Sequence, residues 1–99
     1  MRKFMDIVGL RLSAMRALWG IVTPNLRKVS IQEKNQVISL YFYYDQEPSQ
    51  EEIDLSEDAA TEVISDFSNP YLIACEKQVV KSPEKINFIG YLVYSRFEK

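Results

Sequence analysis

The sequence predicts an α+β fold: a single domain with the element order α-β-β-α-β-β, in which two helices pack on one face of a four-stranded antiparallel sheet. Two segments with helical periodicity and four segments rich in β-branched and aromatic residues support this fold class. Turn-forming residues separate the segments. A chain of 99 residues that is 46% apolar has the size and composition of one globular domain.

The first helix is expected over residues 3–20, where apolar side chains recur at spacings of three and four. Gly20 and Pro24 end this helix. Since Met15 is an alternative start, we expect residues 1–14 to be a variable N-terminal helical extension of a domain that spans residues 15–99. Arg11 and Arg16 fall outside the apolar face of the helix, which is formed by Val8, Leu12, Met15 and Trp19.

Two strands are expected next, at residues 26–32 and 36–44, joined as a hairpin through Glu33, Lys34 and Asn35. The second of them is the strongest strand pattern in the chain. Its alternation places Ile38, Leu40, Phe42 and Tyr44 on one face of the sheet, and Val37, Ser39, Tyr41 and Tyr43 on the other.

The second helix has a clear start signal, because Ser49 precedes Glu52 by three residues and so forms a capping box. The helix is expected to reach about Phe67 and to stop at Ser68-Asn69-Pro70. Strands are then expected at residues 71–81 and 86–97, with a turn at Ser82-Pro83-Glu84 that makes a second hairpin. Gly90 is expected to mark a bulge or a close approach of two backbones.

Charge is strongly segregated along the chain, although the formal net charge is only −2. Residues 35–67 contain nine acidic side chains and no Lys or Arg, whereas the flanking segments are mainly basic. Such segregation bears on partners and association rates rather than on fold.

Most of these acids form one face of the second helix. At about 100° per residue, Glu51, Asp54, Asp58, Glu62 and Asp66 lie opposite Ile53, Ala60, Val63, Ile64 and Phe67. The like-charged pairs at i, i+4 oppose helix formation by about 1 kcal/mol in total. Three explanations remain open: a solvated face, neutralisation by a basic residue within the fold (Arg11, Arg16, Arg27 or Lys28), or a surface for a basic partner.

The residues needed for most catalytic and metal sites are missing. The chain has no His, no calcium-binding loop and no phosphate-binding glycine loop, so we expect no enzyme, no metal and no cofactor. Cys75 lies in an apolar run and is expected to be a buried, inert thiol. The acidic balance argues against nucleic-acid binding, and no segment is apolar enough to cross a membrane. Without a cysteine framework or a signal peptide, we expect a cytoplasmic protein.

Three stretches resemble a family of small bacterial proteins. They are Met15–Ser30, with its Gly-x-Val-Thr-Pro-Asn-Leu-Arg motif, Tyr43-Tyr44-Asp45 followed by Pro48-Ser49, and Ala60–Phe67. The resemblance covers residues 15–98, within which Trp19 stands where a smaller residue is more usual. The family is similar to the immunity proteins of contact-dependent growth inhibition and other polymorphic toxin systems. The resemblance therefore implies a protein that binds and neutralises a toxin domain.

Together, the acidic helix face and the resemblance predict an immunity protein that binds a basic toxin domain, with a nuclease as the expected target. The expected contact residues are Asp45, Glu47, Glu51, Asp54, Asp58, Glu62 and Asp66, with Tyr43 or Tyr44 as an aromatic anchor. The alternative is a non-enzymatic housekeeping module that forms a homodimer through its aromatic sheet or its first helix and has no toxin partner.

Overall fold

The computed structural model describes residues 6–67 and 70–98. The expected chain order of two helices and four strands is confirmed, although residues 3–5 of the expected first helix and Ser68 and Asn69 of the expected helix stop lie outside the described residues. The elements are α1 (Ile7–Ala17), β1 (Leu26–Lys34), β2 (Val37–Tyr44), α2 (Gln50–Ser65), β3 (Leu72–Val79) and β4 (Tyr91–Ser95).

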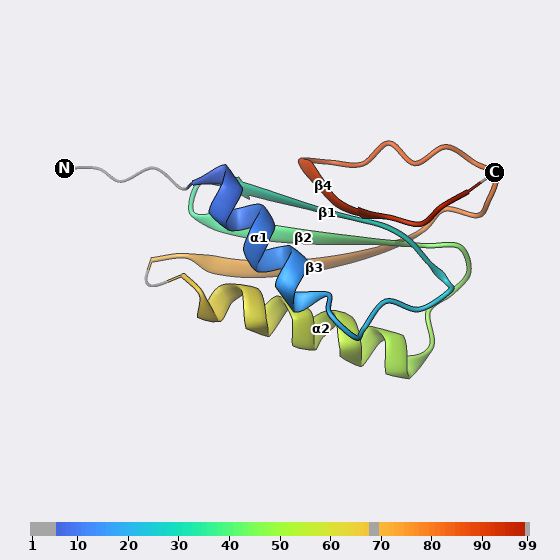
Figure 1. Cartoon of the computed structure of the whole chain (residues 1–99), viewed down its shortest axis with the longest axis horizontal. Coiled ribbons are helices and arrows are strands. Elements are labelled where there is room, and N and C mark those ends of the chain that lie inside the picture. The colour runs from blue at the N-terminus through green and yellow to red at the C-terminus, as the bar shows by residue number, and fades with distance from the viewer. Residues whose placement is uncertain (1–5, 68–69, 99) are drawn as a thin grey trace.

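The sheet is mixed, so the expectation of a fully antiparallel sheet was wrong. Its strand order is β3-β2-β1-β4. β1 pairs antiparallel with both β2 and β4, whereas β2 and β3 run parallel from Val37↔Leu72 to Tyr44↔Val79. The physical reason is α2, which carries the chain back along the length of the sheet, so that β3 starts beside the start of β2 (Figure 1).

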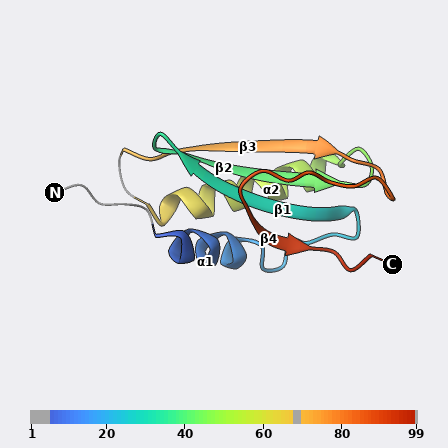
Figure 2. The ribbon, with the colours of Figure 1, turned by 90° about the horizontal axis from the view of Figure 1, so that it is seen from above.

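The first hairpin is confirmed, but the second is absent. Asn35 and Gln36 connect β1 to β2 with positive φ angles of 52° and 66°, as in the two-residue turns that match the twist of paired strands. By contrast, β3 and β4 lie at opposite edges of the sheet. The connection over residues 80–90 therefore crosses the face of the sheet that the helices leave free (Figure 2).

This crossing connection makes a second, small buried region. Ile86 is 5% exposed, and the backbone N–H of Ile89 donates a hydrogen bond of 3.2 Å to the hydroxyl oxygen of Tyr43. At its end, Gly90 has a φ of +82° and lies directly against β1. A Cβ at this position would be 2.3 Å from the carbonyl oxygen of Ile31. The expected close approach at Gly90 is therefore confirmed.

The main core lies between the sheet and the two helices, which cover the same face, as expected (Figures 1 and 2). The predicted alternation of β2 is confirmed, because its helix-facing side chains are completely buried or nearly so. Opposite them, α2 contributes Ala59, Ala60 and Val63, and α1 contributes Leu10, Ala14 and Ala17. Leu10 and Ala14 thus belong to the core. The expectation that residues 1–14 form a variable extension concerns sequence variation and stays a prediction.

A buried guanidinium fixes the C-terminal segment to the sheet. Arg27 in β1 is 3% exposed and donates to the carbonyl oxygen of Val80 at 2.6 Å and to both carboxylate oxygens of Glu98 at 2.7 and 2.9 Å. Arg96 also donates to Glu98 and to Asp45. The hydrogen bonds from Arg27 are the main reason that the pKa of Glu98 falls from 4.5 to about 2.

Gly90 and Gly20 allow a matched test of the crossing connection. Both have a positive φ, but apart from its two chain neighbours no described residue has an atom within 4 Å of a Cβ built on Gly20. We expect Gly20→Ala to lower the free energy of unfolding by about 1 kcal/mol through backbone strain alone. Gly90→Ala should lower it considerably more, because the β1 backbone has to move as well. Urea unfolding measures both values, and equal losses would contradict the close packing at Gly90.

The Arg27–Glu98 pair predicts a specific pH dependence of stability. A carboxyl group whose pKa is lower in the folded state stabilises the protein above its unfolded pKa, and that stabilisation disappears as the pH falls through its folded pKa. We therefore expect Glu98→Gln to be less stable than the parent at pH 7, with a difference that shrinks between about pH 4.5 and pH 2. Urea unfolding across this range measures the difference, and a constant difference would rule out this role for the carboxylate.

Candidate functional site

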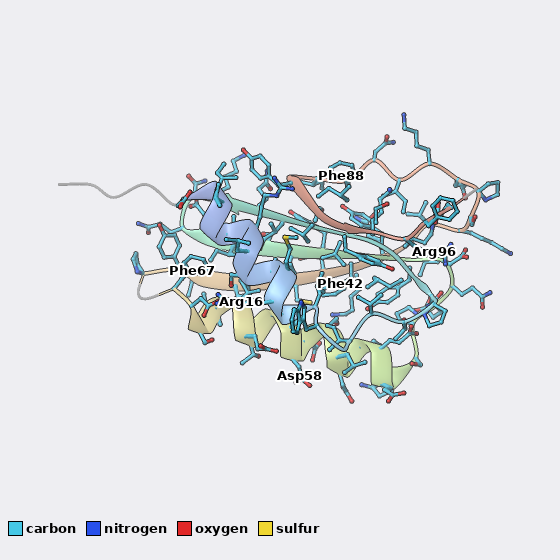
Figure 3. The ribbon with its side chains drawn as sticks, in the orientation of Figure 1. Arg16, Phe42, Asp58, Phe67, Phe88 and Arg96 are labelled. Atoms are coloured by element: carbon cyan, nitrogen blue, oxygen red, sulfur yellow. The ribbon has the colours of Figure 1, made fainter. Side chains whose placement is uncertain are left out.

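The exposed face of α2 carries a row of carboxylates. The capping box at Ser49 and Glu52 is confirmed and starts the helix, so Asp54, Asp58 and Glu62 follow at intervals of one turn. All three are exposed, and among the described residues none of them forms an ion pair with Lys or Arg. Asp58 points away from the sheet (Figure 3). We call Asp54, Asp58 and Glu62 the acidic row.

Glu51 and Glu47 are also exposed, near the start of α2. Glu47 lines a shallow polar hollow of about 440 Å³ between the connection that leads into β1 and the start of α2. Asp45 lines the same hollow but has partners within the fold: Arg96 at 3.2 Å and the backbone N–H of Ser82 at 2.8 Å. The hydrogen bond from Ser82 is the largest influence that lowers the pKa of Asp45. The negative charge of Asp45 is therefore partly neutralised by Arg96 within the molecule.

Asp66 is neutralised within the fold. One of its carboxylate oxygens accepts hydrogen bonds from the hydroxyl of Ser13 at 2.6 Å and from the guanidinium of Arg16 at 3.0 Å, both on α1. Arg16 lies between the two helices (Figure 3). Internal neutralisation therefore applies to Asp66. Lys77 on β3 likewise pairs with Glu57 on α2 at 3.5 Å. Neutralisation does not extend to the acidic row, because the other candidate cations have different partners: Arg11 contacts Leu92, Arg27 contacts Glu98 and Lys28 contacts Ser95.

Tyr43 and Tyr44 are buried, being 1% and 2% exposed, so neither ring lies on the surface as the sequence analysis expected. Tyr43 is covered by the crossing connection, whereas Tyr44 faces the helices and stacks on Phe42 with ring centroids 6.3 Å apart. Burial raises the pKa of Tyr44 to about 12. Alternation along β2 correctly separated the two rings, but it could not reveal that both faces of the sheet are covered.

Glu52 has a structural role that sequence analysis found only in part. Besides its capping-box bond to the N–H of Ser49 at 2.9 Å, its carboxylate accepts hydrogen bonds from Thr23 and from Asn25. Burial alone would raise the pKa of Glu52, but these hydrogen bonds outweigh that influence, so the pKa is lowered. Glu52 therefore holds the start of α2 against the connection between α1 and β1.

The apolar face predicted for the first helix points outward. Val8 is 64% exposed, Leu12 54%, Met15 45% and Trp19 85%. The core side of α1 is instead made of Leu10 and of small residues, since Ser13, Ala14 and Ala17 are buried. Amphipathic surface helices ordinarily turn their large apolar residues to the core. We call Val8, Leu12 and Met15 on α1, together with Trp19 in the turn directly after it, the apolar stripe of α1. Sequence periodicity identified its members but not the direction in which they point.

The described residues contain no group of His, Cys, Asp and Glu side chains that could hold a metal ion. Cys75 is half-buried, and burial is the main reason that its pKa is raised, which disfavours the reactive thiolate. Within residues 6–67 and 70–98, no helix has the length and apolar character required to span a membrane.

The outer surface of the two-helix layer therefore combines an apolar stripe on α1 with an acidic row on α2, separated by the Arg16–Asp66 ion pair. Comparison with curated proteins finds no significant match. Comparison with protein families finds a match to the MafI2 immunity protein over residues 8–98, which is nearly the whole chain. This chain belongs to the MafI2 immunity protein family.

Proposed function

We propose that the chain protects bacterial cells in the cytoplasm by binding a basic toxin domain, with a nuclease as the expected target, in a polymorphic toxin system of the contact-dependent growth inhibition type. Family membership supports a toxin-neutralising role and a cognate toxin as partner. The observation that supports the site is the acidic row, which is exposed and forms no ion pair with Lys or Arg in the described part of the chain, because the nearby Arg16 and Lys77 pair with other acids of α2 or its end.

The geometry of the acidic row suits a binding role better than a catalytic one. Its carboxylates project into solvent from a regular helix, whereas catalytic acids usually lie in a cleft that changes their pKa. We therefore propose that the protein is not an enzyme. Successive members of the row are about 6 Å apart along the helix axis. A regular line of negative charge can occupy the basic groove in which a nuclease holds the phosphates of its substrate, and it also accelerates association with such a groove.

The second candidate is a housekeeping module that forms a homodimer. The observation that favours it is the apolar stripe, because large apolar side chains aligned on one exposed face are typical of interaction surfaces. Sedimentation of the isolated protein separates the two candidates: the immunity function is compatible with a monomer, whereas this alternative requires a dimer.

The charge of the acidic row can be tested by reversing it. We expect the toxin to be encoded directly upstream of this gene. In the variant Asp58→Lys/Glu62→Lys, the affinity for that toxin domain should fall about tenfold or more at low salt. The loss should occur mainly in the association rate, and the dependence of affinity on salt should become shallower. Surface plasmon resonance at several salt concentrations measures both quantities.

A matched control is Glu76→Lys/Glu84→Lys, which changes the net charge by the same amount at exposed positions on β3 and in the crossing connection. If both double variants lose affinity equally, net charge explains the effect and the acidic row is not the contact. If the unmodified chain neither binds this toxin domain nor protects cells that express it, the proposed function itself is wrong.

A further inference from the structure

We propose that the apolar stripe of α1 is the centre of the toxin-binding surface, and that its occupant is an apolar patch on the toxin domain bordered by basic side chains. This inference rests on the proposed function. It assigns to the apolar stripe the contact that makes dissociation of the complex slow. Trp19, which is 85% exposed, is the expected anchor.

Side-chain size is distributed unevenly around α1. Ala14 and Ala17 are 0% and 2% exposed, so small residues allow the helix to lie close to the sheet. The larger Leu12, Met15 and Trp19 point outward, where they contribute little to the core. Single exposed apolar residues are common on protein surfaces, but an aligned set is typical of interaction sites. The stability of the fold therefore gives no reason for the stripe.

The apolar stripe lies beside the acidic row in the helix layer. Ser13, in the middle of α1, contacts Asp66 at the end of α2. Thr23, which follows α1, contacts Glu52 near the start of α2. The two helices therefore lie side by side and run in roughly opposite directions. Because the stripe and the acidic row are both exposed, on two helices that pack on the same face of the sheet, they lie on the same outer surface of this layer. An apolar centre beside a charged rim is the usual anatomy of a specific protein interface.

Charge identifies the kind of partner. A second copy of this chain would bring a second acidic row to the same layer, whereas the two cations of α1 already have contacts within the fold, Arg16 with Asp66 and Arg11 with the carbonyl oxygen of Leu92. Such a dimer would concentrate charges of one sign around its apolar contact, which is unfavourable. A partner with basic side chains around an apolar patch would be complementary to both the apolar stripe and the acidic row.

The two parts of the surface predict different kinetic effects, which allows a direct test. Charged rims mainly affect association rates, whereas buried apolar contacts mainly affect dissociation rates. We expect Leu12→Ser and Trp19→Ser each to weaken binding to the upstream-encoded toxin domain at least tenfold, through faster dissociation and with an unchanged salt dependence. The matched control is Leu72→Ser on β3: it is the same substitution as Leu12→Ser at a residue that is 65% rather than 54% exposed, and it should change affinity less than twofold.

Several results would overturn the inference. Unchanged dissociation in Leu12→Ser and Trp19→Ser, alongside weakened binding in Asp58→Lys/Glu62→Lys, would reject the apolar centre and leave the proposed function intact. A dimeric parent that Trp19→Ser converts to a monomer, with toxin binding unchanged, would assign the stripe to a second copy. No binding by the unmodified chain would reject the proposed function, and this inference with it. Thermal unfolding of each variant verifies that the substitutions leave the fold stable, as expected for exposed positions.

Discussion

The carboxylate of Glu52 is the contact on which the arrangement of the two helices depends. It closes the capping box of α2 and at the same time accepts hydrogen bonds from Thr23 and Asn25, in the connection that joins α1 to β1. The start of α2 is thereby held against the connection that leads into β1, while Ser13, in the middle of α1, donates to Asp66 at the end of α2. With contacts at both ends of α2, the two helices form one layer and keep their outer faces free. One acid of the acid-rich segment thus organises the surface on which the others are displayed.

The Gly-x-Val-Thr-Pro-Asn-Leu-Arg segment, which carries the family resemblance, has a structural role throughout. Gly20 follows α1 with a positive φ, Thr23 and Asn25 bind Glu52, Leu26 is in the core, and Arg27 fixes the C-terminal segment through Glu98. The carbonyl oxygen of Pro24 accepts a hydrogen bond from Arg96. A segment of this kind maintains the scaffold, so it gives no information about the contact with a toxin. The contact residues that we propose lie outside it, on the exposed faces of α1 and α2.

The parts of the fold that sequence analysis predicted correctly are determined by local interactions. The capping box fixes the start of α2, the alternation of β2 depends on side-chain geometry, and Gly90 occupies a backbone conformation that other residues resist. The pairing of β3 is not local. The β2-α2-β3 order favoured parallel strands, because a helix between two strands usually returns the chain to the same end of the sheet. The turn signal at Ser82 and Pro83 suggested a hairpin instead, although residues 80–90 in fact cross the sheet to its other edge.

The direction of the α1 stripe could not be predicted, for a reason that bears on function. Periodicity assigns residues to a helix face, but α1 has two faces able to pack: Leu10 with small neighbours, and the large residues Leu12, Met15 and Trp19. Which of them meets the sheet depends on how closely the helix can approach, and that is a property of the assembled fold. The face with the small residues packs against the sheet, so the large apolar residues are left exposed to solvent. Folding does not explain the composition of this exposed surface, and this is the reason that we propose it as a binding surface.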